Sequence, residues 1–409
     1  MHHFWCNPLA IWVTTRQSFG PHCGAVLSLE KKREVRDMKV TLERADLLKS
    51  LNHVHRVVER RNTIPILSNV LLKAEGGELV FKATDLDLEV LETAPAMVEA
   101  PGATTVPAHM LHDIVKKLPD GTQVTLTLSE DQSSLSIDAG RSHFTLPVLP
   151  IADFPDITAG EFSHTFAIPA RDIKKLIDHT QFAISTEETR YYLNGIYVHT
   201  LDVDGETLLR AVATDGHRLA QAQLSAPNGS AGMPGIIIPR KTVSEIQKLI
   251  EDPDADLAVE LSEAKIRLKI GSVVLTSKLI DGTFPDYERV IPKGNDKILR
   301  VENSLFAQAV DRVSTVSNER GRAVKLSLEQ GRLVLSVSNP ESGTATDELA
   351  VDYGSDAMEI GFNARYLLDI TNQLESDSAQ FSLADSGSPT LIQDEGSIGT
   401  LYVLMPMRV

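Results

Sequence analysis

Asp215-Gly-His217 places a carboxylate and an imidazole two residues apart, and it comes closest in this sequence to a catalytic pair. A carboxylate that orients a histidine can support general acid–base catalysis, so one hypothesis is a hydrolase that uses Asp215 and His217. Such an enzyme also needs a nucleophile or a bound metal. The sequence has no serine or cysteine nucleophile signature and no HExxH, CxxC or P-loop motif. A structural turn is the simpler interpretation, and we expect no catalytic residues, no metal and no cofactor.

The first 37 residues differ from the rest of the 409-residue chain. They hold both cysteines and both tryptophans, and they show no sustained helical or strand period. Their apolar part, 9–13, is too short for a secretory signal, and a new pattern begins at Met38. We interpret 1–37 as an unstructured extension or a start codon placed too early, with a functional N-terminal arm as the alternative. The remainder has no cysteine for a disulfide or a thiolate metal site, which fits a cytoplasmic protein.

The remaining residues repeat one pattern three times. Ala-Thr-Asp ends at Asp85 and again at Asp215, and Phe-Pro-Asp likewise recurs after 130 residues. In a more diverged third copy, Asn339 aligns with Asp215. We therefore expect three domains, spanning 38–160, 161–296 and 297–409. Their combined length exceeds that of one hydrophobic core, and no apolar run of 18 residues predicts a membrane span.

Each repeat contains two segments with the helical spacing of apolar residues, as in Leu47, Leu51 and Val54. The expected helices span 44–61, 108–118, 170–182 and 240–250, with two more in the third repeat around 305–313 and 366–374. Segments such as 123–128 and 265–270 alternate apolar and polar residues, which predicts strands. Two helices against antiparallel sheets, repeated three times, predict an α+β architecture.

The formal charge of −16 argues at first against a nucleic-acid partner, but the charge is unevenly distributed. The first 37 residues hold five basic and three acidic residues, so the rest of the chain carries −18. The four expected helices of the first two repeats together carry +7, which leaves −25 on the remainder. A basic helical surface on an acidic protein can hold phosphates while the rest of the molecule repels DNA.

Basic side chains also follow the helical period in two stripes. The stripes consist of Lys49, His53, Arg56 and Arg60, and of Arg171, Lys174 and Lys175. One stripe alone is compatible with a solvated face, but the separation of charge favours contact with phosphates. No DNA-reading motif and no interleaved aromatic series is present, so we expect sequence-independent contact. A scaffold or adhesion repeat protein is a third hypothesis, and it does not explain basic helices on an acidic molecule.

Several strings stand in the order and spacing of one family. They are Thr63-Ile-Pro-Ile-Leu67, Arg190-Tyr-Tyr-Leu-Asn-Gly195, Ala213-Thr-Asp-Gly-His-Arg-Leu219, Ser277-Lys-Leu-Ile-Asp-Gly282, Phe284-Pro-Asp-Tyr287, Gly361-Phe-Asn363 and Met405-Pro-Met-Arg408. From Met38 to Val409 the chain resembles the bacterial DNA polymerase III beta subunit. The resemblance implies three domains of the DNA-clamp fold and a non-catalytic processivity factor. It further implies a homodimer joined head to tail as a ring, whose helices line a hole for duplex DNA.

The resemblance also implies how the clamp meets its partners. Short peptides of the replicative polymerase, the clamp loader and repair proteins would dock on it, with no membrane involved. Arg61 matches a DNA-contacting arginine of the family, and the charge pattern adds further residues. Those expected to face DNA are Lys49, Arg56, Arg60, Arg61, Arg171, Lys174, Lys175, Arg240 and Lys241. The implied contact between the chains joins Phe144 and Leu146 of one copy to Thr315 and Val316 of the other.

The family's peptide pocket maps to the boundary between the second and third repeats. The matching residues are Tyr192, Leu193, Thr214, Gly216, His217, Arg218, Leu219, Pro285, Arg289, Val290, Asn363, Tyr366, Pro389, Val403, Leu404, Met405, Pro406, Met407 and Arg408. Gly387 and Pro389 fall where the family pattern is less constant. Methionine, leucine and proline side chains suit an adaptable apolar groove, and we expect His217 and Arg218 to orient a peptide's polar ends. A terminal core strand is the alternative interpretation of Met405-Pro-Met407.

Overall fold

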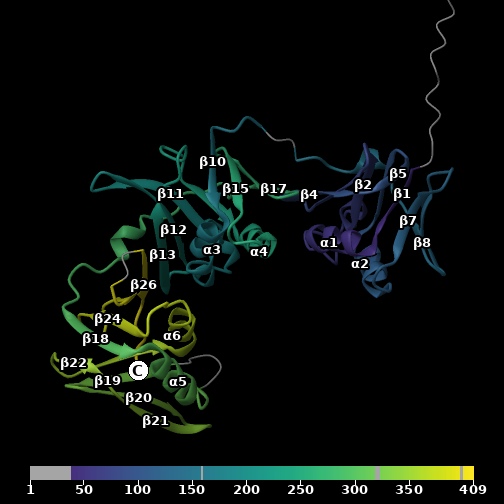
Figure 1. Ribbon diagram of the computed structural model, residues 1–409. Coiled ribbons are helices and arrows are strands. Elements are labelled where there is room, and N and C mark those ends of the chain that lie inside the picture. The colour runs from purple at the N-terminus through teal and green to yellow at the C-terminus, as the bar shows by residue number, and fades with distance from the viewer. Residues whose placement is uncertain (1–37, 158–159, 318–322, 397–398) are drawn as a thin grey trace, which may run out of the picture. The chain divides into compact units, whose positions relative to one another are not determined.

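A computed structural model describes residues 38–157, 160–317, 323–396 and 399–409, and the predicted extension 1–37 lies outside them. The described residues form six α-helices and 26 strands in four antiparallel sheets (Figure 1). The predicted α+β architecture, with two helices in each of three repeats, is therefore confirmed. No helix in these ranges is long and apolar enough to cross a membrane.

The helices begin close to the predicted positions. They are α1 Arg44–Val54, α2 Ala108–Lys117, α3 Ala170–Asp178, α4 Arg240–Leu249, α5 Asn303–Ser314 and α6 Ala364–Thr371. A proline, at 107, 169 or 239, directly precedes α2, α3 and α4. Its missing N–H interrupts no helical hydrogen bond there, so strand and helix can join without a loop.

Several predicted helix ends were wrong. Helix α1 stops at Val54 instead of continuing to Arg61, because the chain turns at His55. The predicted end at Phe182 is also too late, since α3 ends at Asp178 and a separate 3-10 turn follows. Leu305, at the start of the helix expected around 305–313, is 44% exposed and lies outside the apolar face of α5.

Two of the sheets lie within one repeat each. One is ordered β5 Met97–Ala100, β1 Lys39–Glu43, β7 Gln123–Leu128, β8 Ser134–Ala139 and β9 Ser142–Pro147. The other is ordered β21 Gly343–Ala350, β20 Arg332–Asn339, β19 Ala323–Glu329 and β23 Met358–Asn363. Strands β9 and β21 each end their sheet, so their outer edges have no strand partner among the described residues.

The other two sheets each cross from one repeat to the next. One is ordered β10 His164–Pro169, β15 Asp256–Leu261, β16 Lys265–Ile270, β17 Val273–Lys278, β4 Leu88–Pro95, β3 Glu78–Thr84, β2 Asn69–Glu75 and β6 Gly102–Pro107. The other is ordered β14 Ile236–Pro239, β11 Gly195–Val203, β12 Glu206–Thr214, β13 Arg218–Ser225, β26 Thr400–Leu404, β25 Thr390–Asp394, β24 Ser378–Leu383, β18 Lys297–Glu302 and β22 Asp352–Tyr353. The repeats are thus joined by the pairs β4–β17 and β13–β26.

The helices bury their apolar faces against these sheets. Leu47 and Leu51 of α1 and Leu111 of α2 are fully buried in the first repeat. In the third repeat Phe306 of α5 meets Phe381 of β24 edge to face, with ring centroids 5.1 Å apart. The apolar period visible in the sequence therefore describes the packing in each repeat.

Candidate functional site

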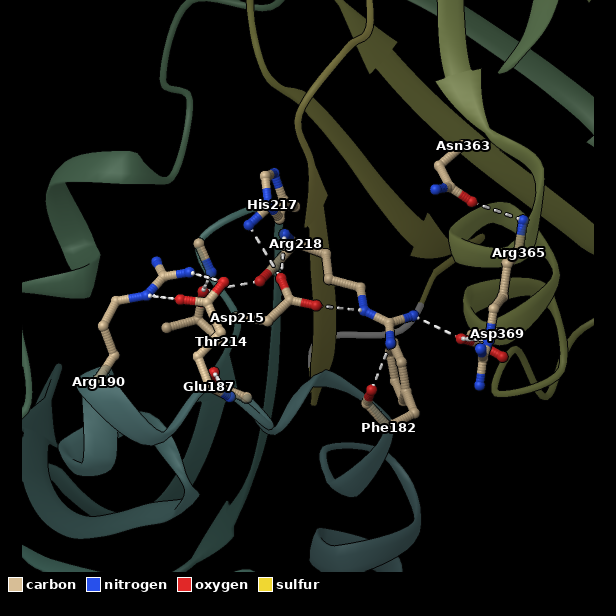
Figure 2. Close-up of polar contacts among 12 residues, drawn as sticks. Phe182, Glu187, Arg190, Thr214, Asp215, His217, Arg218, Asn363, Arg365 and Asp369 are labelled. Atoms are coloured by element: carbon tan, nitrogen blue, oxygen red, sulfur yellow. Dashed lines mark hydrogen bonds and ion pairs between the residues drawn. The ribbon is translucent and has the colours of Figure 1, made fainter. Parts of the chain in front are cut away.

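The turn Asp215-Gly-His217 joins β12 to β13 at the boundary between the second and third repeats (Figure 2). One oxygen of the Asp215 carboxylate accepts the backbone N–H groups of His217 and Arg218, at 2.9 and 3.0 Å. Gly216 has a φ of +87°, a conformation that glycine adopts without strain. Asp85 makes the same turn in the first repeat by accepting the N–H groups of Asp87 and Leu88. The carboxylate thus closes a turn, as the simpler interpretation predicted.

Arg218 fastens the second repeat to the third. Its guanidinium donates to Asp215 at 3.1 Å, to Asp369 of α6 at 2.6 Å and to the carbonyl of Phe182 at 2.6 Å (Figure 2). It also lies over the Tyr366 ring, 4.3 Å from the centroid. The residue is 8% exposed, and three of its five guanidinium N–H groups are occupied by these bonds, so a role in orienting a peptide stays a prediction. This residue holds the wall of the candidate pocket in place.

Three predicted pocket residues meet in a small apolar cluster that is separate from the main core. Leu193, Leu219 and Val403 are all buried there, and β13 pairs with β26 so that Leu219 lies opposite Val403. Phe284 and Tyr287 belong to the same cluster. Residues around Phe-Pro-Asp therefore pack against both repeats, and an apolar cluster lies where the peptide pocket was predicted.

The rim of this cluster is accessible. Val290 is 48% exposed and Met405 is 40% exposed. The His217 ring is exposed and stacks on Tyr366, with centroids 6.3 Å apart. Met405 is fixed beside them because its N–H donates to the carbonyl of His217 at 2.9 Å. Strand β26 ends at Leu404, so the alternative of a core strand through Met405-Pro-Met407 was wrong.

Other predicted pocket residues lie away from this cluster or have structural roles. Asn363 caps α6 by accepting the N–H of Arg365 at 2.9 Å (Figure 2). Arg289 pairs with Asp286 on the surface. The carbonyl of Pro389 accepts a hydrogen bond from Asn295. Met407 and Arg408 line a different hollow, together with Gly361, Asp385 and Val409 among others.

The residues expected to face DNA fall into two groups. Arg56, Arg60, Arg61 and Arg240 are exposed and have no ion-pair partner within the described ranges. The other five are paired, Lys49 with Glu251, Arg171 with Asp254, Lys174 with Asp178, Lys175 with Glu375, and Lys241 with Glu59 and Asp85. A cation without a protein partner can take a phosphate at no cost in internal contacts, so the first group is the stronger candidate.

Three of the four free arginines, Arg56, Arg60 and Arg61, lie on the turn that follows α1. Val58 in this turn accepts a hydrogen bond from His109 of α2, and Val57 accepts one from Lys241 of α4. The turn thus lies between two helix beginnings. Two cations at the end of α2, Lys116 and Lys117, are exposed and also lack an ion-pair partner in the described part of the chain. The sequence analysis did not include them, although the net charge of +1 on that helix was a usable signal.

His53 was wrongly assigned to the basic stripe. Its side chain is buried, and its two ring nitrogens contact Glu92 at 2.7 Å and Glu251 at 3.1 Å. Burial opposes protonation of the ring, but the hydrogen bonds and charges of Glu92 and Glu251 outweigh it and raise the pKa of His53. This histidine is therefore part of the junction between the first two repeats.

The residues expected at a contact between copies lie at two ends of the described fold. Phe144 and Leu146 are on the edge strand β9, and Thr315 and Val316 directly follow α5. Leu146 is only 9% exposed and points into the core of its own repeat. A charge at Leu146 would therefore damage the fold of the first repeat as well as an interface.

Family models for the DNA polymerase III beta subunit match the chain three times. The N-terminal domain model covers residues 38–158, the central domain model 167–286 and the C-terminal domain model 288–408. The beta sliding clamp of Caulobacter vibrioides is 56% identical over 372 residues, which are 91% of this chain and 100% of that protein. That of Escherichia coli K12 is 41% identical over 374 residues, with the same coverage.

Solved structures agree with these sequence matches. A DnaN sliding clamp from Bartonella birtlesii, bound to griselimycin, is 58% identical with a TM-score of 0.89, covering 91% of this chain and 100% of its own. A beta sliding clamp from C. crescentus is 55% identical with a TM-score of 0.90, covering 92% and 100%.

Proposed function

The chain belongs to the DNA polymerase III beta subunit family of DNA sliding clamps, and from that premise we propose which surfaces close a ring, meet DNA and hold partner peptides. The protein is a non-catalytic processivity factor for DNA replication. The hydrolase hypothesis has no support, because Asp215 is occupied within its own turn. We propose a cytoplasmic location, since the protein acts on bacterial DNA.

One observation carries the proposal of a head-to-tail homodimer. Each crossing between repeats pairs the strand after the Asp85 or Asp215 turn with the last strand of the next repeat. Strand β21 is the third copy of the strand that follows this turn, and β9 is the last strand of the first repeat. Both outer edges are free among the described residues. A second copy therefore fits, with β21 of each chain beside β9 of the other and Val316 near Phe144.

The proposed domains are 38–160, 161–296 and 297–409, and six of them form one ring. We propose that the exposed Arg56, Arg60, Arg61 and Arg240 make the first contacts with phosphates. The paired basic residues of α1, α3 and α4 then bind phosphates by exchanging their carboxylate partners for them. This exchange is possible because surface ion pairs contribute little free energy. Since phosphates carry no sequence information, the contact is the same for all DNA sequences.

For partner peptides, we propose the groove above Leu193, Leu219 and Val403, with His217, Tyr366 and Met405 on its rim. A peptide with a glutamine, a leucine and a terminal aromatic or leucine would place its apolar side chains on this floor. Burial of two such side chains contributes roughly 3–6 kcal/mol before the costs of association, which are several kcal/mol. The expected affinity is micromolar, and weak binding lets many partners exchange on one ring.

Two measurements test the proposed ring. Sedimentation should give a particle of twice the 44.7 kDa chain mass at micromolar concentration. Protein loaded on nicked circular DNA should stay bound in high salt and be released when the DNA is linearised, because a topological link needs no ionic contact. A monomer at micromolar concentration, or equal retention on circles and linear DNA, would contradict the ring.

A further inference from the structure

A three-residue contact recurs at both junctions between repeats. At the first junction, Glu251 accepts Lys49 at 2.9 Å and His53 at 3.1 Å. At the second, Glu375 accepts Lys175 at 3.3 Å and His179 at 3.1 Å. The histidine side chains are 7% and 6% exposed, so both rings are held nearly out of water. We call each set a clasp.

The two clasps occupy equivalent positions in the repeats. Lys49 is the sixth residue counted from the start of α1 and His53 is the tenth, while Lys175 and His179 hold the same places relative to α3. Glu251 and Glu375 are each the twelfth residue counted from the start of α4 and α6. A lysine of the first helix of one repeat and a histidine one turn later thus both contact a carboxylate just beyond the second helix of the next repeat.

The two ends of the described fold lack every member of the clasp. The sixth and tenth positions of α5 are Gln308 and Arg312, and the twelfth position counted from the start of α2 is Pro119. Arg312 pairs within its own repeat, with Asp347 of β21 at 2.7 Å. The surfaces that would meet between two copies therefore carry neither the carboxylate nor the lysine and histidine.

One backbone hydrogen bond that forms at both junctions within the chain could not form between two copies. The N–H of Lys278, the last residue of β17, donates to the carbonyl of Asp87 across the first junction at 2.8 Å. The N–H of Met405, just after β26, donates in the same way to His217. The counterpart of Lys278 in β9 is Pro147, because both are the sixth residue of strands whose hairpins have the same register. Proline has no N–H to donate.

We propose that the clasp strengthens the two junctions within the chain and that the junction between copies is built without it, so that the two kinds of junction differ in strength. This inference rests on the head-to-tail dimer proposed above. The lysine–glutamate pairs of the clasps lie at the surface and contribute little free energy, so the nearly buried histidines account for most of the effect. Without the glutamate, the Nε2 atom of each histidine would lose its hydrogen-bond partner out of water, which is costly. A contact without the clasp and with one hydrogen bond fewer separates more easily. The same kind of junction is thus stronger inside the chain than between copies.

Installing the clasp between copies tests the inference. The variant P119E/Q308K/R312H should exchange subunits at least about tenfold more slowly than the wild type, since a charge-assisted hydrogen bond contributes enough for that factor. The variant P119Q/Q308K/R312H is the matched control, because it makes the same changes without the carboxylate and should exchange faster than the glutamate variant. Exchange is followed by energy transfer between fluorophores on introduced cysteines, after Cys6 and Cys23 are replaced by serine.

Two further variants examine the parts separately. Pro147→Ala restores an N–H and should slow exchange severalfold on its own. Glu375→Gln should broaden the distance distribution between labels on the second and third repeats, whereas Glu329→Gln on an exposed strand end should not. Equal exchange rates for the glutamate variant and its glutamine control would overturn the inference while leaving the dimer intact. A wild type without dimers would instead contradict the ring itself.

Discussion

The division of the basic residues into free and paired groups leads to a quantitative prediction. Replacing Arg56, Arg60 and Arg61 by glutamine removes three exposed guanidinium groups that have no ion-pair partner in the described ranges. Each cation that neutralises a phosphate contributes about 0.9 to the slope of log K against log salt. If all three contact phosphates, the slope for a short linear duplex should become less steep by up to about 2.7.

The matched control replaces Arg171, Lys174 and Lys175, which pair with Asp254, Asp178 and Glu375. A lysine that leaves a carboxylate for a phosphate leaves the carboxylate to recruit a new cation, so the net release of ions is small. We expect the slope of this second triple variant to change by less than about 1. For each variant, the loss of affinity should be the same whatever the DNA sequence.

The assay is fluorescence anisotropy of labelled duplexes, titrated at several salt concentrations well below physiological ionic strength. Circular dichroism should first show that both variants retain the fold. The reasoning would be refuted if the paired triple lost as much slope as the free triple, because pairing would then not determine which cations meet phosphates. A marked preference of the wild type for one sequence would contradict backbone contact altogether.

Three more predictions concern the junctions and the pocket. Arg218→Met should lower the free energy of unfolding by about 3 kcal/mol. This is the low end of the range for breaking a buried ion pair, because the Asp369 side chain is 29% exposed to water. An unchanged urea midpoint would show that the guanidinium does not hold the second and third repeats together. Deleting residues 405–409 should abolish calorimetrically detectable binding of the glutamine- and leucine-containing peptide, and His217→Ala should weaken it. Both variants should remain dimeric. If the truncated form bound the peptide with the same affinity as the wild type, the pocket would have been placed wrongly. Because the pKa of His53 is raised in the folded state, its pair with Glu92 should stabilise the protein fully below the ordinary pKa of 6.5 and lose that effect as pH rises through the raised value. The difference in unfolding free energy between wild type and His53→Gln should therefore shrink as the pH rises from about 5 to about 8. A difference that stays constant would exclude an ionised pair.

Local patterns in the sequence predicted most of the fold. The strands predicted at 123–128 and 265–270 match β7 and β16, because alternation along a strand depends only on which face is buried. The helix starts also follow from local signals, since Pro107 and Pro239 stand directly before them. The end of α1 did not, because Val57 and Val58 continue the apolar period beyond the helix. Hydrogen bonds from His109 and Lys241 fix the turn there, and those residues lie 51 and 184 positions away.

The candidate sites were only partly predictable for the same reason. The resemblance grouped Leu193, Leu219 and Val403, and the structure brings these three residues into one cluster. It could not reveal that Arg218 donates a hydrogen bond to Asp369, a partner 151 residues away. Similarly, Lys175 appears in the sequence as a free cation, but its partner Glu375 is 200 residues distant. Whether a charge is available depends on long-range packing, which neither composition nor helical spacing contains.

The two unlike free edges, β9 and β21, also bear on what happens when the protein is abundant. A chain with complementary but different ends can in principle polymerise without limit, as head-to-tail contacts do whenever they fail to close. Once two copies have met at one contact, however, the second contact is intramolecular, with an effective concentration in the millimolar range. Growth into a filament would need a third copy at its much lower free concentration. Ring closure is therefore favoured over growth into a filament, and it pairs both exposed strand edges in one step.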